Sequence, residues 1–313
     1  MIYEYALEPE MVATWGELQK YRFFYNEFGF NRGRIVSRYP KSWAKKVYET
    51  YSGNDDMEKA RLVTILQKIS ENSIKRKETC WEEEKNNWLA NAICEHSRHP
   101  FDAILARSNP DNLQEIISEE DIGILSFVNW DIPAGITVKR NATEMAKAVT
   151  PMLSRCKWVK FIDPYFSKTM QRHKDSLISF LKIMNHDGPV SSRHDKQIEI
   201  HTRGNGASSE HLKTYYEKII PHGMTATLLQ WQEKQKGQKL HNRYILTDIG
   251  GVSFQHGLDV GEEGETDDIT RLDFAQYEFR CRQYDAASTA FVKAEPPIVI
   301  AGKLKGALPK DEK

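Results

Sequence analysis

The sequence is poor in cysteine and in clustered metal ligands. Its 313 residues include four cysteines, Cys80, Cys94, Cys156 and Cys281, and no two of them have the short spacing of a zinc knuckle or a disulfide framework. We therefore expect four free thiols in a reducing compartment. The acidic residues between positions 259 and 268 alternate with glycines and are interpreted as an acidic loop, in preference to a metal site. The sequence predicts no cofactor and no metal.

Long apolar runs are also missing. No window approaches the roughly 18 consecutive apolar residues of a membrane-spanning helix. The first residues, from Met1 to Tyr5, lack the basic start and apolar core of a secretory signal. The sequence therefore predicts a cytoplasmic protein without a membrane span.

The chain has no net charge, but its charges are unevenly spread. The 44 basic and 44 acidic residues cancel, yet residues 136–245 carry 19 Lys and Arg against 9 Asp and Glu, an excess of ten. A basic segment favours an anionic partner, either nucleic acid or an anionic lipid surface. The alternative, at equal weight, is that these side chains only solvate the outer faces of helices.

The length of the chain predicts two domains. We place the boundary at the Pro/Gly break of residues 131–135. Residues 1–135 predict a mainly helical N-terminal domain, a candidate for interaction or dimerisation. Residues 136–313 alternate strand and helix patterns, which predicts an α/β fold with a mixed, mostly parallel sheet covered by helices. Within this second domain, residues 273–280 predict a late strand.

The most informative stretch is residues 239–259. Two apolar runs, residues 244–246 and 252–254, flank a turn that contains Asp248 and two glycines, which predicts a β-hairpin. His241 and Arg243 stand two residues apart just before the first run, so both side chains project from one face of an extended chain. A nucleophile or proton carrier beside a permanent cation suits a phosphate ester.

This spacing resembles the phospholipase D superfamily signature, His-x-Lys followed by four residues and Asp. The resemblance implies that His241 attacks phosphorus, that Arg243 holds the phosphoryl oxygens in place of the lysine, and that Asp248 supports the site. Arginine keeps the charge of lysine and adds a bidentate fork. The Gly-Ser-x-Asn that usually follows the hairpin in this family is missing, and residues 255–259 read Gln-His-Gly-Leu-Asp.

The sequence motif resembles even more closely the phospholipase D-like domain at the C-terminus of MIT-domain proteins. That domain pairs a His-x-Arg strand with a downstream Gly-Leu-Asp, and it is regarded as a non-catalytic, membrane-binding dimer. Residues 158–166, an apolar run that ends in Asp-Pro-Tyr-Phe, resemble the opening strand of the same fold. The resemblance covers roughly residues 136–300 and none of the first domain.

Charged and titratable residues gather where the predicted strands end, and ligands of open α/β sheets gather outside the carboxyl ends of strands. The candidate catalytic residues are His241, Arg243, Asp248 and His256. The candidate substrate-binding residues are Asp163, Tyr165, His201, Arg203, Lys239 and Asn242. A structural role is an equally weighted alternative for His201 and His256.

The resemblance implies a metal-independent phosphodiesterase or nuclease that acts on DNA or RNA through a phosphohistidine on His241. The leaving oxygen needs a proton, and the chain has one motif copy. A homodimer that brings two His241 side chains together supplies this proton, and the alternative is His256 of the same chain. Bacterial antiviral defence proteins can join a helical domain to a domain of this kind. By this analogy, the chain is a candidate antiviral defence effector.

The competing function is binding without turnover. A catalytically degenerate phospholipase D-like module would keep the anionic-ligand pocket and serve as an adaptor for polyanions. The missing Gly-Ser-x-Asn and the Arg in place of Lys favour this function, and the intact His and Asp spacing opposes it. A third hypothesis makes the N-terminal domain a docking site for a protein partner.

Overall fold

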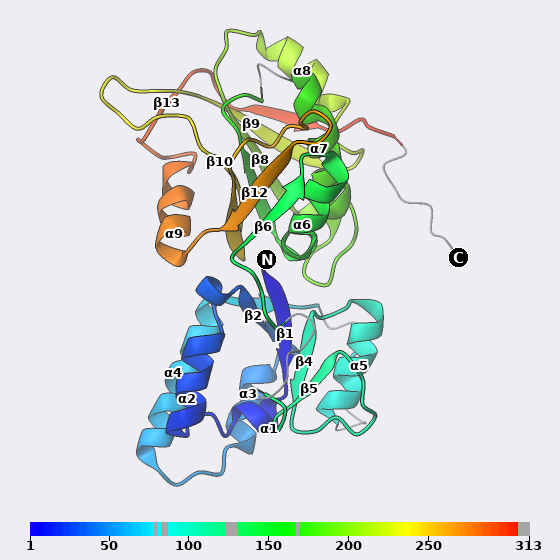
Figure 1. Cartoon of the computed structure of the whole chain (residues 1–313), viewed down its shortest axis with the longest axis vertical. Coiled ribbons are helices and arrows are strands. Elements are labelled where there is room, and N and C mark those ends of the chain that lie inside the picture. The colour runs from blue at the N-terminus through cyan, green and yellow to red at the C-terminus, as the bar shows by residue number, and fades with distance from the viewer. Residues whose placement is uncertain (78–79, 83–86, 123–129, 167–169, 306–313) are drawn as a thin grey trace. The chain divides into compact units, whose positions relative to one another are not determined.

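The chain folds into two compact units. The computed structural model describes residues 1–77, 80–82, 87–122, 130–166 and 170–305 (Figure 1). Ile2–Pro133 form the N-terminal unit, and Ala134–Lys313 together with Met1 form the C-terminal unit. The division therefore falls within the Pro/Gly break of the sequence. Each unit combines helices with a sheet, so the expected α/β class is confirmed.

The N-terminal unit is built on a five-stranded sheet with the order β3-β2-β1-β4-β5. All of its pairings are parallel. The strands are β1 (Tyr3–Leu7), β2 (Arg34–Arg38), β3 (Ser73–Lys75), β4 (Ala103–Ala106) and β5 (Ile116–Ser118). The helices are α1 (Pro9–Val12), α2 (Leu18–Glu27), α3 (Trp43–Thr50), α4 (Asp56–Glu71) and α5 (Trp88–Arg98), with a short 3-10 turn at Phe30–Arg32.

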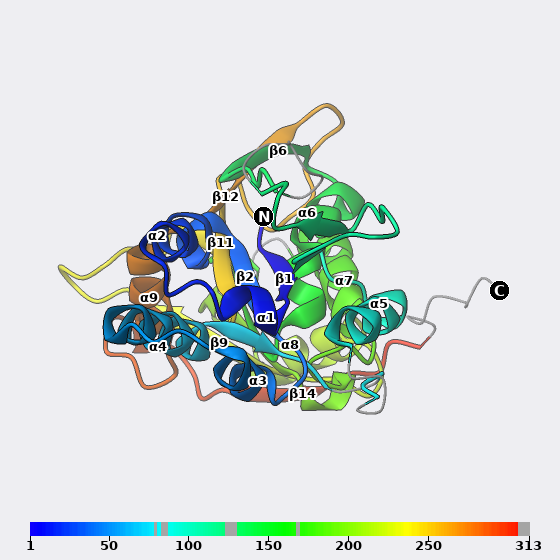
Figure 2. The ribbon, with the colours of Figure 1, turned by 90° about the horizontal axis from the view of Figure 1, so that it is seen from below.

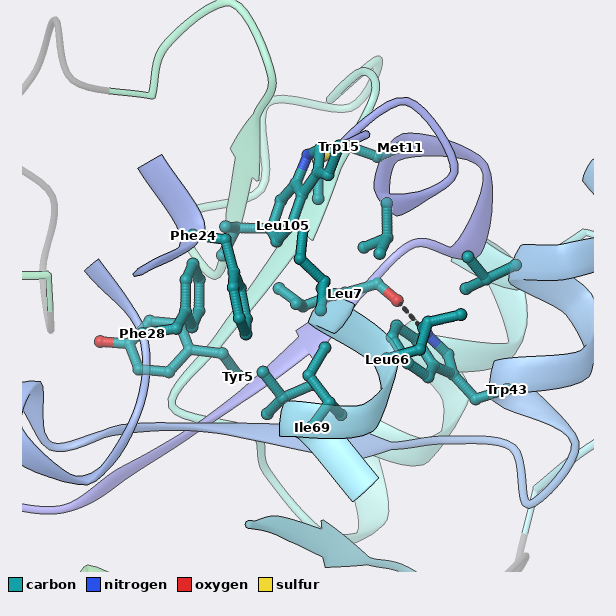
Figure 3. Close-up of a cluster of buried hydrophobic side chains, with 14 of the residues drawn as sticks. Tyr5, Leu7, Met11, Trp15, Phe24, Phe28, Trp43, Leu66, Ile69 and Leu105 are labelled. Carbon is teal, nitrogen blue, oxygen red and sulfur yellow. Dashed lines mark hydrogen bonds between the residues drawn. The ribbon is translucent and has the colours of Figure 1, made fainter. Parts of the chain in front are cut away.

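Helices cover both faces of this sheet, because successive strand residues point to opposite sides. Tyr5 and Leu7 face a core formed with α1 to α4, and Trp43 donates its indole N–H to the Leu7 carbonyl at 2.7 Å (Figure 3). Within this layer, α2 and α4 run side by side (Figure 2). Ala6 and Ile104 point the other way, into a second core with α5.

Helices hold more residues of this unit than strands do, as expected, but the sequence analysis did not predict the five-stranded sheet at its centre. Its strands are three to five residues long, and β4 and β5 are buried throughout. A strand covered on both faces shows no alternation of polar and apolar residues, so its pattern does not separate it from a helical or irregular segment. The four helices of the first face carry the stronger periodic signal.

The C-terminal unit holds a nine-stranded mixed sheet. The order is β13-β9-β8-β7-β10-β11-β12-β6, and β14 also pairs with β9. The strands are β6 (Gly135–Lys139), β7 (Trp158–Ile162), β8 (Gln197–Arg203), β9 (Thr225–Gln232), β10 (Arg243–Thr247), β11 (Gly250–Phe254), β12 (Thr266–Arg271), β13 (Val292–Lys293) and β14 (Ile298–Ala301). The helices are α6 (Ala142–Arg155), α7 (Met170–Met184), α8 (Ser209–Glu217) and α9 (Phe274–Gln283), with a 3-10 turn at Arg193–Asp195.

The predicted hairpin is present as β10 and β11, but the sheet around it is not mostly parallel. Among the strands that the structure describes in this unit, β7–β8 and β8–β9 are the parallel pairs. The pairs β7–β10, β10–β11, β11–β12 and β12–β6 are antiparallel, as are the contacts of β9 with β13 and β14. Short connections such as the one between β10 and β11 can join only antiparallel neighbours. The expectation of mostly parallel pairing in this unit was therefore wrong.

Helices again cover both faces of the C-terminal sheet (Figure 1). Phe180 of α7 stacks on Phe161 of β7, while the neighbouring Ile162 packs in the core that contains Tyr277 of α9. Helix α9 corrects a second expectation, because residues 273–280 were predicted as a strand. Asp273 accepts the amide of Gln276, and the Gln276 side chain accepts the Asp273 amide, a capping box that starts the helix.

The cysteines also depart from the expectation. Cys80 and Cys94 form a disulfide in the N-terminal unit, so the prediction of free thiols was wrong for this pair. Cys156 and Cys281 are free. The two bonded residues are 14 positions apart, a spacing that no short motif reveals. The cytoplasmic location, which was inferred in part from free thiols, stays a prediction.

No helix within the described residues is long and apolar enough to cross a membrane.

Candidate functional site

The candidate site lies at one end of the β10–β11 hairpin. In the sheet register, Tyr244 of β10 pairs with Ile162 of β7, and Ile162 pairs with His201 of β8. The start of β10 therefore lies beside the carboxyl ends of two parallel strands, the edge at which ligands of α/β sheets gather. On the other side, Arg243 pairs with Phe254, the last residue of β11.

A pocket of about 410 Å³ opens at this edge. His241, Asn242 and Arg243 line it in sequence, and the first two are exposed. Its remaining walls are Tyr244, Ser253, Phe254, Gln255, Asp268 and Thr270. The two arms of the hairpin and β12 thus bring the predicted His-x-Arg pair to an open, largely polar cavity.

Arg243 is held in place without being neutralised. Its guanidinium carbon lies 5.2 Å from the centroid of the Tyr165 ring, a cation–π contact, and Nη1 lies 3.5 Å from the carbonyl oxygen of Gln255. Within the described residues, its buried Nε has no hydrogen-bond partner and no carboxylate forms an ion pair with it. The side chain is therefore a cation with donors left for an anionic ligand.

His256 is paired with a buried carboxylate that the sequence analysis did not select. Asp267 of β12 is 1% exposed, and its Oδ1 lies 3.3 Å from Nδ1 of His256. The same oxygen accepts the amides of Gln255 and His256 at 3.0 Å each. The His256 side chain is 53% exposed. A fixed carboxylate on one ring nitrogen orients an imidazole and leaves its other nitrogen for chemistry.

Both histidines leave the hairpin at the same end. His241 stands two residues before Arg243, and His256 stands two residues after Phe254, which is the pairing partner of Arg243. Both histidines lie just outside the strands, two residues from the paired Arg243 and Phe254. His241, Arg243 and His256 therefore lie at the same end of the hairpin.

Asp163 supports the site through buried hydrogen bonds and does not line the pocket. It is fully buried, and its Oδ2 lies 3.2 Å from Nε2 of His173 on α7. The amides of Tyr165 and Leu258 donate to it at 2.9 Å each. Burial acts to raise the pKa of Asp163, but His173 and the two amides outweigh burial and hold that pKa below its usual value. Asp163 therefore positions Tyr165.

Each residue of the Gly257-Leu258-Asp259 segment has a structural role. Gly257 has a φ of 148°, and a Cβ there would lie 2.6 Å from Oδ1 of Asp259. The amide of Leu258 binds Asp163. Asp259 forms ion pairs with Arg140 at 2.8 Å and with Arg172 at 3.2 Å. The segment therefore ties the end of the hairpin to α7 and to the turn between β6 and α6.

His201 is a satisfied buried residue. The indole N–H of Trp231 donates to its Nδ1 at 3.0 Å, and its Nε2 lies 2.9 Å from Oε2 of Glu199. Burial lowers the pKa of His201, opposed in part by Glu199. With both ring nitrogens engaged and 1% of the residue exposed, His201 has no capacity for substrate. The structural alternative is the one that the geometry favours.

The remaining basic candidates converge on Glu233. Arg203 contacts Oε1 of Glu233 and the carbonyl of Leu240, both at 2.7 Å. Lys239 contacts Oε2 of the same carboxylate at 3.0 Å and is otherwise exposed. These two cations fix the segment that leads into β10, and Lys239 retains most of its surface for an anion.

Asp248 lies at the far end of the hairpin. The five residues of β10 separate it from the His241 end, which is about 17 Å at ~3.3 Å per residue. Its Oδ1 accepts the amides of Lys157 at 2.7 Å and Trp158 at 3.4 Å. Burial raises the pKa of Asp248, and the amide donors act against that rise. The residue fixes the start of β7 and takes no direct part in the site.

Metal-ligating residues do not gather here. Within the described part of the chain, no three His, Cys, Asp or Glu residues are arranged to hold a metal ion. The site offers two imidazoles, a guanidinium and a buried carboxylate.

Comparisons with known proteins add little. No protein-family model matches the chain, and no curated protein matches it. The solved structure of TrmBL2, an archaeal chromatin protein with a novel mode of DNA binding, is similar with a TM-score of 0.25 and 10% sequence identity. The similarity covers 49% of this chain and 52% of that chain, about half of each. A similarity this low supports no conclusion about fold or function.

Proposed function

We propose that the His241 edge binds and cleaves the phosphodiester backbone of a nucleic acid. The observation that carries the proposal is the uncommitted Arg243 guanidinium at the open end of the β10–β11 hairpin, the end at which His241 and His256 also lie. A permanent cation attracts the phosphate, and two imidazoles supply the nucleophile and the proton carrier that transfer to phosphorus requires.

The reaction follows from these roles. Neutral His241 attacks phosphorus in line, and the P–N bond forms as the bond to the leaving oxygen breaks. Arg243 stabilises the charge on the equatorial oxygens with its remaining donors. Protonated His256, oriented by Asp267, gives its proton to the leaving oxygen. Neutral His256 then takes a proton from water, which attacks phosphorus and releases His241.

The single-chain arrangement is favoured over the shared dimer site. A dimer was expected because the chain has one motif copy, but His256 already has the orienting carboxylate that a proton donor needs. The homodimer stays a prediction for assembly and is not required for the chemistry. Nucleic acid is the proposed substrate because residues 136–245, which end at this site, carry the basic excess of ten charges.

Binding without turnover is the second candidate, and one observation favours it. The imidazole of His241 has no hydrogen-bond partner among the residues that the structure describes, so nothing there fixes its tautomer or direction. A nucleophilic histidine is normally oriented through its second nitrogen. The site would then hold a phosphate through Arg243 and leave it intact.

Two measurements on the same proteins separate the candidates. Cleavage of fluorescent single-stranded DNA and RNA is followed in single-turnover reactions, and binding is followed by fluorescence anisotropy. We expect His241→Ala to lower cleavage at least about 1,000-fold while affinity stays within about threefold, because the nucleophile is lost and the cation remains. Arg243→Ala lowers both.

The matched control is His211→Ala, which removes an exposed histidine on α8. Wild-type protein that binds without cleaving would establish the second candidate. Wild-type protein that neither binds nor cleaves would overturn both. Cleavage that persists in His241→Ala would remove the phosphohistidine mechanism.

A further inference from the structure

Helix α9 lies against the β10–β11 hairpin and runs along β10 toward the end that carries His241 (Figure 1). The hydroxyl of Tyr277 donates to the carbonyl of Thr247, the last residue of β10, at 2.6 Å. About one helical turn later, the guanidinium carbon of Arg280 lies 5.2 Å from the ring centroid of Tyr244, the second residue of β10. Tyr244 is itself a wall of the pocket at the candidate site. The last turns of α9 therefore stand beside that site.

Arg280 is a second arginine at this site without an acidic partner. Its Nη1 donates to Oε1 of Gln283 at 2.8 Å. No carboxylate among the residues that the structure describes forms an ion pair with it, and the neighbouring Glu278 lies 3.8 Å from Arg282 instead. The guanidinium therefore keeps its full charge and further N–H donors for a phosphate.

Phe279 presents an aromatic ring to solvent directly beside this cation. The residue is 41% exposed, and the guanidinium carbon of Arg280 lies 5.0 Å from the centroid of its ring. A single exposed ring needs no functional explanation. An exposed ring next to an arginine at a candidate phosphate site is different, because single-stranded nucleic acids bind by stacking a base on a ring while a cation holds the backbone.

The end of α9 is tied to the loop that leads into β10. The side-chain amide of Gln283 donates to the side-chain oxygen of Gln238, which directly precedes Lys239. The ion-paired Lys239 still exposes 76% of its side chain. Arg243, Arg280 and Lys239 therefore border the same end of the hairpin from α9, from β10 and from the loop before it.

The charges on the pocket walls set the direction in which a bound strand leaves the site. Asp268 is the acidic residue of the lining, and it lies on β12, two strands away from β10 in the sheet order. Its Oδ1 accepts the hydroxyl of Thr137 at 2.6 Å, which fixes the carboxylate there. A phosphate backbone held at Arg243 is repelled by Asp268 and attracted by Arg280. The backbone is therefore drawn toward α9 and away from β12.

We propose that Phe279 and Arg280 form a secondary site for single-stranded nucleic acid, next to the phosphate that Arg243 holds. An unpaired base stacks on the ring of Phe279, and Arg280 binds the adjoining phosphate. The bases of a duplex are stacked on one another and do not reach the ring, so this surface selects a single strand of DNA or RNA. The inference rests on the proposed function, because it names the class of substrate for the same site.

Fluorescence anisotropy of the full chain tests this surface with two probes, an oligothymidine strand and its duplex with oligoadenine. We expect the wild type to bind the strand about tenfold more tightly than the duplex, and Phe279→Leu to lose most of this preference. Leucine keeps an apolar side chain but removes the ring face. Arg280→Gln should lower strand affinity and make the log–log salt slope shallower by about 0.7, the contribution of one phosphate contact to a single strand.

Two matched controls accompany these variants. Phe274→Leu removes a ring that is 45% exposed at the first residue of α9, and its preference for the strand should match that of the wild type. Lys213→Ala removes an exposed positive charge on α8, and its salt slope should match that of the wild type.

The outcomes separate this inference from the proposed function. Wild type without a preference for the strand, an unchanged preference in Phe279→Leu, or an equal loss in Phe274→Leu would overturn the inference, and cleavage by the wild type would leave the proposed function standing. A preference that depends on Phe279 in a protein that does not cleave would remove the cleavage and keep the secondary site. Wild type that does not bind the strand would overturn both.

Discussion

Asp267 and Asp163 are both buried carboxylates beside a histidine, yet they do different work. Asp163 accepts two amides and faces the buried His173, so all of its partners are internal. Asp267 also accepts two amides, but its histidine is half exposed at the site. The first pair therefore stabilises the fold next to the site, and the second orients a half-exposed imidazole at the candidate site.

Removing the charge of Asp267 should weaken catalysis more than binding. We expect Asp267→Asn to lower the rate of nucleic-acid cleavage by about 100-fold, because a positioned proton carrier contributes ~10²–10⁴ to the rate. Affinity should stay close to wild type, since Arg243 is untouched. Single-turnover rates and anisotropy on the same variant measure both, with Glu263→Gln in the exposed loop before β12 as the control. A variant that loses affinity and rate in equal measure would show that Asp267 only supports the fold.

Asp163 should make stability depend on pH in the acid range. Its pKa in the folded protein lies below its usual value, so its contribution is fully present above the unfolded pKa of about 3.9 and is lost as the pH falls below it. We expect Asp163→Asn to lower the free energy of unfolding by about 2 kcal/mol at pH 7. The difference from wild type should shrink toward pH 3.

Urea unfolding at pH 7, 5 and 3.5 measures this dependence. Asp175→Asn, on the exposed side of α7, is the control. A difference from wild type that stays constant down to pH 3.5 would contradict the assigned role of the Asp163 charge.

At the scale of elements, the β10–β11 hairpin was predictable and its surroundings were less so. Its two apolar runs and its glycine turn are local signals, and the strands begin and end within two residues of the predicted runs. His241 and Arg243 were found because they share a strand period. Asp267 was missed because it lies on another strand, β12, and only the sheet register brings it to His256.

The predictions for other elements were wrong for physical reasons of the same kind. The apolar residues Phe274, Tyr277 and Phe279 fit either period over so short a segment, and the capping box of α9 was the signal that separates helix from strand. The buried strands of the N-terminal sheet show no alternation at all. Predicted contacts along one segment were reliable, whereas contacts between segments required the fold.

The hairpin also separates a structural motif residue, Asp248, from the proposed nucleophile, His241. We expect Asp248→Ala to lower the free energy of unfolding by about 1–3 kcal/mol, because the amides of Lys157 and Trp158 lose their acceptor. Cleavage and affinity, measured where the variant is fully folded, should match wild type. His241→Ala should show the reverse pattern, with full stability and no cleavage. Loss of cleavage in folded Asp248→Ala would return Asp248 to the site.

At the scale of the whole molecule, the two units differ in the charge that their residues carry. Residues 136–245 hold the basic excess, and residues 1–135 carry 17 basic against 22 acidic side chains. The polyanion proposed for the His241 edge is opposite in sign to the basic segment that ends there. The disulfide between Cys80 and Cys94 belongs to the acidic unit.

Binding of nucleic acid should weaken steeply with salt, because each phosphate that is neutralised releases counterions. We expect a linear fall of log affinity with log salt for the wild type. Arg243→Ala should make the slope shallower by about 0.7–0.9, the contribution of one phosphate contact. Anisotropy titrations at several salt concentrations give both slopes. A slope unchanged in Arg243→Ala would place the phosphate contact elsewhere on the basic segment.

The central claim, that His241 forms a covalent bond to phosphorus, is tested most directly by trapping the adduct. A p-nitrophenyl phosphodiester needs no proton donor, because p-nitrophenolate is a good leaving group. His256→Ala should therefore complete the first step and stall before water attacks. We predict a burst of about one p-nitrophenolate per chain and an adduct that peptide mass spectrometry maps to His241. Three results would contradict the account. They are steady release of p-nitrophenolate without an adduct, an adduct on a residue other than His241, and no release of p-nitrophenolate from the wild type or from His256→Ala.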